Sequence, residues 1–193
     1  MSSLEKPSYT PAEYLAIERA ADRKSEYISG EMVAMSGVSR KHSLIKSQIE
    51  WLLRGQLEGR PCETHSSDLR VNVGTAYFYP DIVVVCGEPK MLDDTFLDTL
   101  LNPTVVIEVL SKSTENYDRG TKFMRYGQIE SLQDYILVSQ QSCRIEHFVR
   151  LGTGEWPRPM ILTSFDDVLA IRSINCMLQV GDIYRGIDVT TVE

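Results

Sequence analysis

The chain has 193 residues, of which 42% are hydrophobic and 24% are charged, and its net charge is -7 at pH 7. This length favours a single domain over residues 1–193, and the composition excludes an intrinsically disordered chain. No run is long enough to span a bilayer, and residues 1–6 lack the apolar segment of a signal peptide, so we expect a cytoplasmic protein without a membrane partner. The negative net charge excludes nucleic-acid binding that depends on overall positive charge. Binding to nucleic acid would need a local Lys/Arg cluster, a dimer groove or a bound metal.

Four cysteines are scattered along the chain, with no CxxC pair and no histidine at zinc-ligand spacing. They are Cys62, Cys86, Cys143 and Cys176. In a reducing compartment we expect them to be small core residues and not metal ligands or disulfide partners.

The N-terminal elements are predicted from capping and turn signals. Thr10, Pro11 and Glu13 form a capping pattern that predicts a helix ending near residue 22. Two short apolar runs flank Ser29 and Gly30, which predicts a hairpin over residues 26–35 with Glu26 on its first strand.

The middle of the chain alternates between helical and extended patterns. Apolar residues keep helical spacing from Ser39 to Glu58. Residues 69–73 alternate and predict a half-exposed strand, while the runs 80–86 and 104–110 are apolar almost throughout, as in central strands covered on both faces. We expect a polar loop between those two runs, with or without a short helical turn.

The remaining elements follow the same reasoning. Ser113 or Thr114 caps a predicted helix that continues through Lys122 to about Glu130. Further strands are predicted at residues 134–139, 144–149 and 160–162, and one helical turn at 180–184. The order of elements from 39 to 139 predicts an α/β (α+β) fold with a mixed sheet flanked by helices, to which the early helix and hairpin and the late strands are added.

Two of the apolar runs each carry one carboxylate, Asp81 and Glu108. An ionised carboxylate beside a hydrophobic core is costly unless a cation or hydrogen-bond donors compensate it. On neighbouring strands, these two residues would suit a hard divalent metal such as Mg²⁺. Lys122 would then face an attacked phosphate, so the set is suited to metal-assisted phosphodiester hydrolysis.

A structural interpretation of the same residues remains open at this point. Asp81 would cap the backbone at a strand start, Glu108 would pair with an arginine, and Lys122 would be solvated on a helix face. Glu108 argues most strongly against this interpretation, because apolar residues flank it on both sides.

Several blocks of the chain resemble the Uma-two family, a group of restriction-endonuclease-like proteins abundant in cyanobacteria, within the PD-(D/E)XK nuclease superfamily. The main blocks are residues 79–86, residues 106–111 with 113–115, and residues 118–122 with Tyr126. Residues 27–32, 39–42 and 67–71 are also similar, and the match covers about residues 9–188 in order. The resemblance implies a restriction-endonuclease-like mixed central sheet with a core at about 39–139, a Mg²⁺-dependent nuclease centre, and a homodimer.

The resemblance also assigns site residues. Asp81 takes the aspartate position of the superfamily motif and Glu108 the second acidic position, both as metal ligands. Leu110 stands where the superfamily usually has lysine, and Lys122 is similar to the relocated lysine of this family, with Lys112 as the less favoured substitute.

Glu26 and His42 are further candidates for the catalytic site. Glu26 matches an acidic family position and would complete the metal shell or orient a water, or else is a surface carboxylate. His42 would touch phosphate or transfer a proton, or else caps its helix or is solvated. Asp68 and Arg70 either line the same cleft or pair on an exposed strand.

The other histidines and aromatic residues have structural interpretations. His65 and His147 have no metal partner at local spacing. Trp51, Tyr135 and Phe148 are predicted to be core or interface residues.

Two functions are therefore compared. The first is a cytoplasmic endonuclease that hydrolyses DNA with Mg²⁺, or with Mn²⁺ as a substitute. The second is a catalytically weak or inactive nuclease-fold module that binds nucleic acid or regulates a partner. A purely structural dimer is a third possibility.

Overall fold

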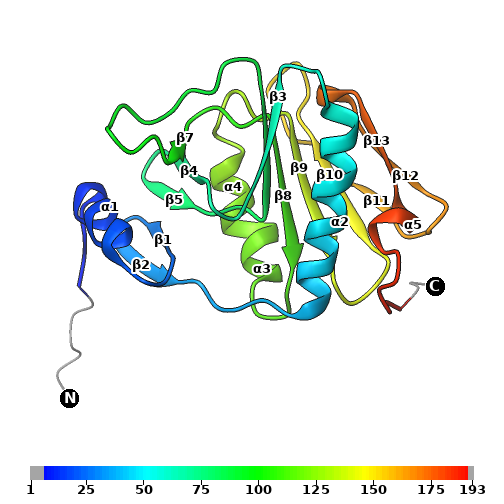
Figure 1. Ribbon diagram of the computed structural model, residues 1–193, viewed down its shortest axis with the longest axis horizontal. Coiled ribbons are helices and arrows are strands. Elements are labelled where there is room, and N and C mark those ends of the chain that lie inside the picture. The colour runs from blue at the N-terminus through cyan, green and yellow to red at the C-terminus, as the bar shows by residue number, and fades with distance from the viewer. Residues whose placement is uncertain (1–6, 191–193) are drawn as a thin grey trace.

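The computed structural model describes residues 7–190, so the expectation about residues 1–6 lies outside the described part of the chain. Figure 1 shows a central sheet with the long helix α2 (Arg40–Leu57) on one face and shorter helical segments and a second sheet on the other. Within residues 7–190, no helix combines the length and the apolar character needed to cross a membrane.

The central sheet has six strands in the order β11-β10-β9-β8-β6-β3. Their bounds are β3 (Cys62–Ser66), β6 (Ile82–Cys86), β8 (Val105–Leu110), β9 (Asp134–Ser139), β10 (Ile145–Val149) and β11 (Met160–Leu162). Strands β8 and β9 run parallel and the other neighbours run antiparallel, so the predicted mixed sheet flanked by helices is confirmed.

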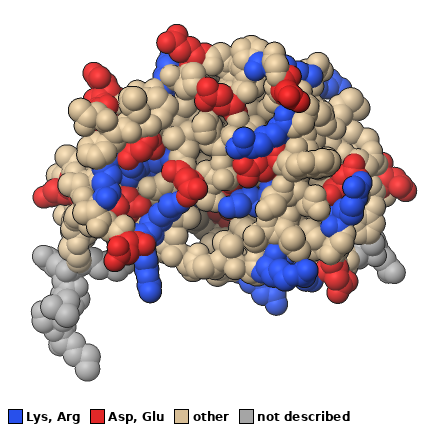
Figure 2. Space-filling model, viewed as in Figure 1, with Lys and Arg blue, Asp and Glu red and all other residues tan. Residues whose placement is uncertain are grey.

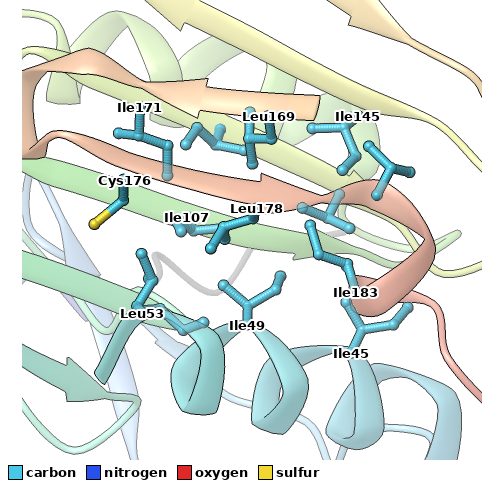
Figure 3. Packing of buried hydrophobic residues seen from close by; sticks show 14 of the residues in the cluster. Ile45, Ile49, Leu53, Ile107, Ile145, Leu169, Ile171, Cys176, Leu178 and Ile183 are labelled. Carbon is cyan, nitrogen blue, oxygen red and sulfur yellow. The ribbon is translucent and has the colours of Figure 1, made fainter. Parts of the chain in front are cut away.

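Alternation along the central strands divides the core into two layers. One layer packs Ile45, Ile49 and Leu53 of α2 against residues such as Ile107 of β8, as Figure 3 shows. The hairpin of β12 (Val168–Ile171) and β13 (Cys176–Gln179), together with η2 (Arg172–Ile174) and α5 (Val180–Ile183), belongs to the same layer. Because successive side chains point to opposite faces, these apolar strands are buried on both sides.

The second layer lies on the opposite face of the central sheet. There Val83, Val106 and Leu137 pack with Phe78 and Tyr126. This face is covered by α3 (Glu115–Tyr117), the π-helical turn η1 (Asp118–Lys122), α4 (Phe123–Tyr126), and a five-stranded sheet of order β2-β1-β5-β4-β7. That sheet contains β1 (Ser25–Ile28), β2 (Glu31–Ala34), β4 (Arg70–Val73), β5 (Ala76–Phe78) and β7 (Thr99–Leu100).

Helix α1 (Pro11–Ala20) packs on the second sheet through a small cluster of tyrosines. The predicted capping box is present: the Glu13 amide donates to the Thr10 hydroxyl, and the Glu13 carboxylate accepts from the Thr10 amide. Pro11 occupies the first helical turn, where it removes no needed hydrogen bond. The hairpin of β1 and β2 also forms as predicted, with Ser29 and Gly30 both at positive φ in its turn.

Several element predictions need correction. The helix predicted from Ser113 or Thr114 to Glu130 is instead the series α3, η1 and α4, which ends at Tyr126, and no side chain caps its start. The loop after β6 contains β7, which pairs in parallel with β4. Strand β3 was not predicted because its sequence, Cys-Glu-Thr-His-Ser, has no apolar alternation.

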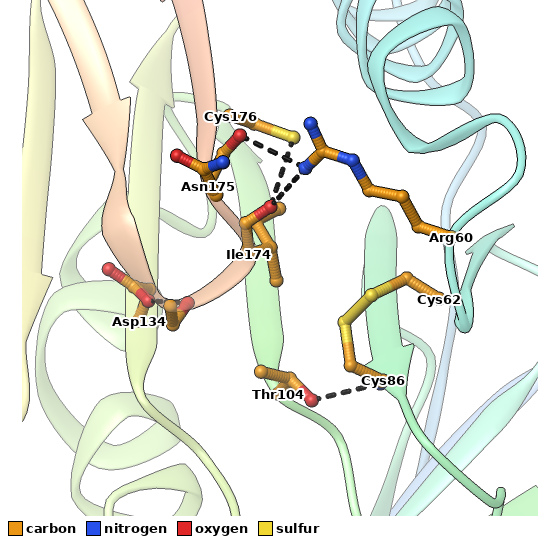
Figure 4. The surroundings of a disulfide bond; sticks show 9 residues. Arg60, Cys62, Cys86, Thr104, Asp134, Ile174, Asn175 and Cys176 are labelled. Carbon is orange, nitrogen blue, oxygen red and sulfur yellow. Dashed lines mark hydrogen bonds between the residues drawn. A yellow bond between two sulfur atoms is a disulfide. The ribbon is translucent and has the colours of Figure 1, made fainter.

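The prediction that none of the four cysteines forms a disulfide is wrong for two of them. Cys62 and Cys86 face each other at one register position of β3 and β6, with Cα atoms 4.0 Å apart, and form a disulfide (Figure 4). Cys143 and Cys176 are buried free thiols, as expected for core residues. The disulfide could not be inferred from spacing. The two cysteines are 24 residues apart in sequence, and they meet only because of the register between β3 and β6.

Two further side chains differ from expectation. Arg70 is only 2% exposed although the alternation placed it on the solvent side, because the second sheet is covered there by α1 and the β7 segment. Trp51 lies on the outer face of α2 with 68% of its surface exposed, so a core position is excluded. Tyr135 is fully buried and Phe148 packs against the same core layer, as predicted.

Candidate active site

Asp81 and Glu108 lie side by side because β6 and β8 are antiparallel neighbours, with Ile82 opposite Ile107. The Asp81 amide lies 3.3 Å from Glu108 Oε2, to which it donates, and the Val109 amide donates to Asp81 Oδ2 at 2.8 Å. These crossed backbone contacts fix both carboxylates at the same end of the two strands.

Lys122 extends into the same place from the π-helical turn. Its Nζ is 2.9 Å from Glu108 Oε1, 3.1 Å from Glu26 Oε1 and 3.9 Å from Asp118 Oδ1. Asp118 and Lys122 are four residues apart, so the turn presents both side chains to the interior. The helix after β8 therefore brings lysine to the carboxylates although position 110 is leucine.

His42 and Glu26 approach from two other elements. His42 lies in the first turn of α2, whose start is capped by Ser39, and its Nε2 is 2.8 Å from Asp81 Oδ1. Glu26 comes from β1, and its Oε1 accepts a hydrogen bond of 3.2 Å from the Tyr79 amide. The structure thus brings together all five residues that the sequence placed in the site.

The site holds more negative than positive charge. Burial raises the pKa of Glu108 well above its ordinary value against the opposing effect of Lys122, and Asp118 and Asp81 raise it further. Burial likewise raises the pKa of Asp118. Burial alone would lower the pKa of Lys122, but Glu108 and Glu26 raise it well above its ordinary value, so its amine stays protonated.

The carboxylates fit a divalent cation that is completed by oxygens from outside the chain. Glu108 Oε1 is buried and accepts no hydrogen bond within residues 7–190, although the Lys122 ammonium lies close to it. In the same range, no three or more His, Cys, Asp or Glu side chains form a ready metal centre. Mg²⁺ is commonly held by one or two carboxylates, while water and substrate phosphate supply the other ligands. Asp81 and Glu108 would be those two carboxylates.

These residues line a pocket of about 370 Å³. Its lining includes the polar residues Asp81, Glu108, His42 and Lys122. The end of β2 and the segment that leads to α2, residues 33–39, also line it. A small molecule or a single unit of a polymer can therefore reach the carboxylates from solvent.

Asp118 and Tyr117 are among the pocket residues that the sequence did not assign to the site. Polar residues are ordinary in a short surface helix, so neither carried a signal beyond the four-residue spacing of Asp118 from Lys122. Three other candidates do not line the pocket. Lys112 is exposed, Asp68 pairs with Lys24, and Arg70 pairs with Asp98.

The other two histidines lie away from the pocket. His147 is buried, with its Nε2 2.6 Å from Asp134 Oδ1. His65 lies 3.1 Å from Glu63 on the edge strand β3. Both agree with a structural interpretation.

Known proteins with the same sequence pattern and fold support a family assignment. The model of the Uma2 (Uma-two) family, described as "Putative restriction endonuclease", matches residues 11–180. Two uncharacterized proteins of Synechocystis are similar: one is 39% identical over 94% of both chains, and the other is 37% identical over 76% of this chain and 84% of its own.

A solved structure shares the fold. It is a crystal structure from Anabaena variabilis, described as a putative nuclease belonging to DUF820, with a TM-score of 0.76 and 18% identity. The superposition covers 91% of this chain and 97% of the other. With the match over residues 11–180, these likenesses show that the chain belongs to the Uma2 family of restriction-endonuclease-like proteins.

Proposed function

We propose that this protein is an endonuclease that hydrolyses DNA phosphodiester bonds with Mg²⁺, for which Mn²⁺ can substitute. The observation that carries the proposal is the convergence of Asp81, Glu108 and Lys122 from three elements at the floor of one pocket. Family membership and the nuclease-like fold support the same class of reaction.

Each of the converging side chains would have a separate role in the reaction. Asp81 and Glu108 would hold the metal ion, which supplies Lewis-acid stabilisation of phosphate charge and a more acidic water. Lys122, protonated and held by Glu26 and Glu108, would face the attacked phosphate and stabilise the charge that develops there.

His42 and Glu26 would orient these groups. His42 contacts the Asp81 oxygen that the Val109 amide does not, so both oxygens of Asp81 have a fixed direction. Glu26 is a second carboxylate partner of the Lys122 ammonium, beside Glu108. Either residue could also exchange a proton with a water in the pocket, since both line it.

A cleavage assay tests the proposal. Purified protein with Mg²⁺ or Mn²⁺ should convert supercoiled plasmid DNA to nicked or linear forms, and Asp81→Asn or Glu108→Gln should reduce the rate at least about 100-fold. Matched controls are Asp166→Asn and Glu88→Gln, which remove exposed carboxylates outside the pocket and should cut like the unchanged protein. Equal cleavage by the two site variants, with their folds intact, would refute the assignment.

A second function is favoured by two specific observations. Leu110 replaces the usual lysine, and the net charge is -7, so a nuclease-fold module that binds a partner without cutting is the alternative. Calorimetry distinguishes the two, because the alternative expects no Mg²⁺ binding while binding to DNA or a protein is retained.

A further inference from the structure

We propose that the substrate enters this site as an unpaired nucleotide, so the preferred substrate is single-stranded, mismatched or frayed DNA and not an intact duplex. This inference rests on the proposed function and specifies its substrate class. It follows from the low exposure of the reactive groups, the apolar residues of segment 33–39 that line the pocket, and the distribution of surface charge.

The reactive groups lie deep in the pocket. The side chains of Glu108, Lys122 and Asp81 are only 5%, 7% and 14% exposed. A phosphodiester must therefore enter the pocket to reach them, and about 370 Å³ is within the range of sites that enclose one small ligand. In a duplex, pairing and stacking hold each nucleotide against its neighbours, and withdrawing one costs a few kcal/mol, least where it is already unpaired.

The segment of residues 33–39 that lines the pocket is suited to the body of a nucleotide. It presents Val33 and Val38, which are 45% and 58% exposed, and Met35 also lines the pocket. Exposed apolar side chains beside a polar site can contact the face of a base, which is available only when the base is unstacked. Tyr117 also lines the pocket, and its buried hydroxyl has no hydrogen-bond partner in the described part of the chain, so a ligand that reaches it would supply the missing partner.

The surface charge agrees with this substrate. Lys and Arg are interleaved with Asp and Glu over the face in Figure 2 and do not form a continuous basic strip. Two basic side chains outside the pocket lining are paired with carboxylates, Lys24 with Asp68 and Arg119 with Glu146, so they are less available to a phosphate backbone. Duplex DNA has the higher charge density and depends more on neutralised phosphates than a single strand does, so this surface disfavours the duplex.

Fluorescently labelled oligonucleotides of one sequence test the proposal in three forms: single strand, full duplex, and duplex with a central mismatch. With Mn²⁺ we expect the single strand and the mismatched site to be cut at least tenfold faster than the duplex. Equal or faster cutting of the duplex would overturn the inference and leave the proposed function standing.

Binding by anisotropy in Ca²⁺ covers the case in which nothing is cut. In that case the absence of cutting refutes hydrolysis, and tighter binding of the single strand would still support the substrate class. Binding that does not distinguish the forms, or no binding, would overturn the inference as well.

Two variants separate the pocket walls from the general fold. Val38→Asp places a charge on the exposed apolar wall and should slow single-strand cleavage at least tenfold, whereas the matched change Val168→Asp on β12 should not. Tyr117→Phe should raise KM about fivefold with kcat and thermal stability kept, because it removes only an unpartnered hydroxyl. Unchanged KM for Tyr117→Phe and unchanged rate for Val38→Asp would contradict the placement of the nucleotide.

Discussion

Lys122 is the counter-charge for the carboxylates that the fold brings into its interior. Four of them, Glu26, Asp81, Glu108 and Asp118, lie in or beside the same pocket, and Lys122 is within 4 Å of three. Burial raises the pKa values of Glu108 and Asp118, neighbouring carboxylates raise them further, and a single ammonium offsets only part of this effect. A divalent cation at Asp81 and Glu108 would offset more of it.

Removing the lysine charge should therefore destabilise the metal-free protein. For Lys122→Met in EDTA, we expect the free energy of unfolding to fall by about 3 kcal/mol, because buried carboxylates lose their ion-pair partner. Mg²⁺ should recover part of this loss, since it supplies positive charge at the same carboxylates. Urea unfolding in EDTA and in Mg²⁺ measures both values, and an equal loss in the two conditions would argue against a metal at this site.

At the residue scale the sequence indicated the site because carboxylates are unusual within apolar runs. Asp81 and Glu108 were identified for that reason, Lys122 was named as the lysine of the following helical pattern that would complete their chemistry, and the family resemblance then gave it the position of the relocated lysine. Tyr117 and Asp118 were not, since polar residues in a short helix are ordinary. Asp118 lies in the π-helical turn, where it is buried with Lys122, and Tyr117 is the last residue of α3, directly before that turn.

At the scale of elements, the site depends on how the second sheet is attached to the rest of the chain. Glu26 belongs to β1, and helix α1 packs over that sheet. Asp98 ties the two together by accepting hydrogen bonds from Arg19 of α1 and pairing with the buried Arg70 of β4. The hydrogen bonds from Arg19 are the largest of the effects that lower the pKa of Asp98 to about 2.

This lowered pKa predicts how stability depends on pH. Because Asp98 is more acidic in the folded state, its contribution is complete above the unfolded pKa of about 3.9 and is lost as pH falls toward 2. Asp98→Asn should lower the free energy of unfolding by about 2 kcal/mol at pH 7, with a difference that shrinks between about pH 4 and pH 2. Denaturant titrations across this range test it, and a difference independent of pH would show that the charge is not responsible.

The disulfide stabilises the edge of the central sheet. Cys62–Cys86 closes a loop of 24 residues between β3 and β6, and Arg60, in the connection between α2 and β3, donates to the carbonyls of Ile174 and Asn175 in the same region (Figure 4).

Replacing both cysteines with alanine should lower the free energy of unfolding by about 3 kcal/mol through the greater freedom of the unfolded chain. The unchanged protein in strong reductant should match the variant. A variant as stable as the oxidised protein would contradict this account of the disulfide.

Elements with strong periodicity were predictable, and elements that depend on tertiary pairing were not. Helix α2 and strands β6, β8 and β9 have apolar patterns that specify their type and burial. Strand β3 is polar along its length and forms by pairing with β6. Strand β7 has two residues and forms through pairing with β4 and a bridge between Leu100 and Met91.

At the scale of the molecule, the two sheets and α2 meet where Asp81, Glu26 and His42 approach one another. Residues from β1, α2, the start of β6, β8 and η1 supply the site, so its geometry requires the complete fold. The expected homodimer and cytoplasmic location remain predictions. Analytical ultracentrifugation measures the first, and a mass of one chain across micromolar concentrations would contradict it.

The position of a bound Mn²⁺ tests the central claim most directly. In crystals of the unchanged protein soaked in Mn²⁺, we expect an anomalous peak in contact with both Asp81 and Glu108. The peak should lie in the pocket that these residues line together with Lys122. Glu108→Gln crystals should lose the peak. Mn²⁺ bound only elsewhere, with Asp81 and Glu108 retaining their present contacts, would contradict the account.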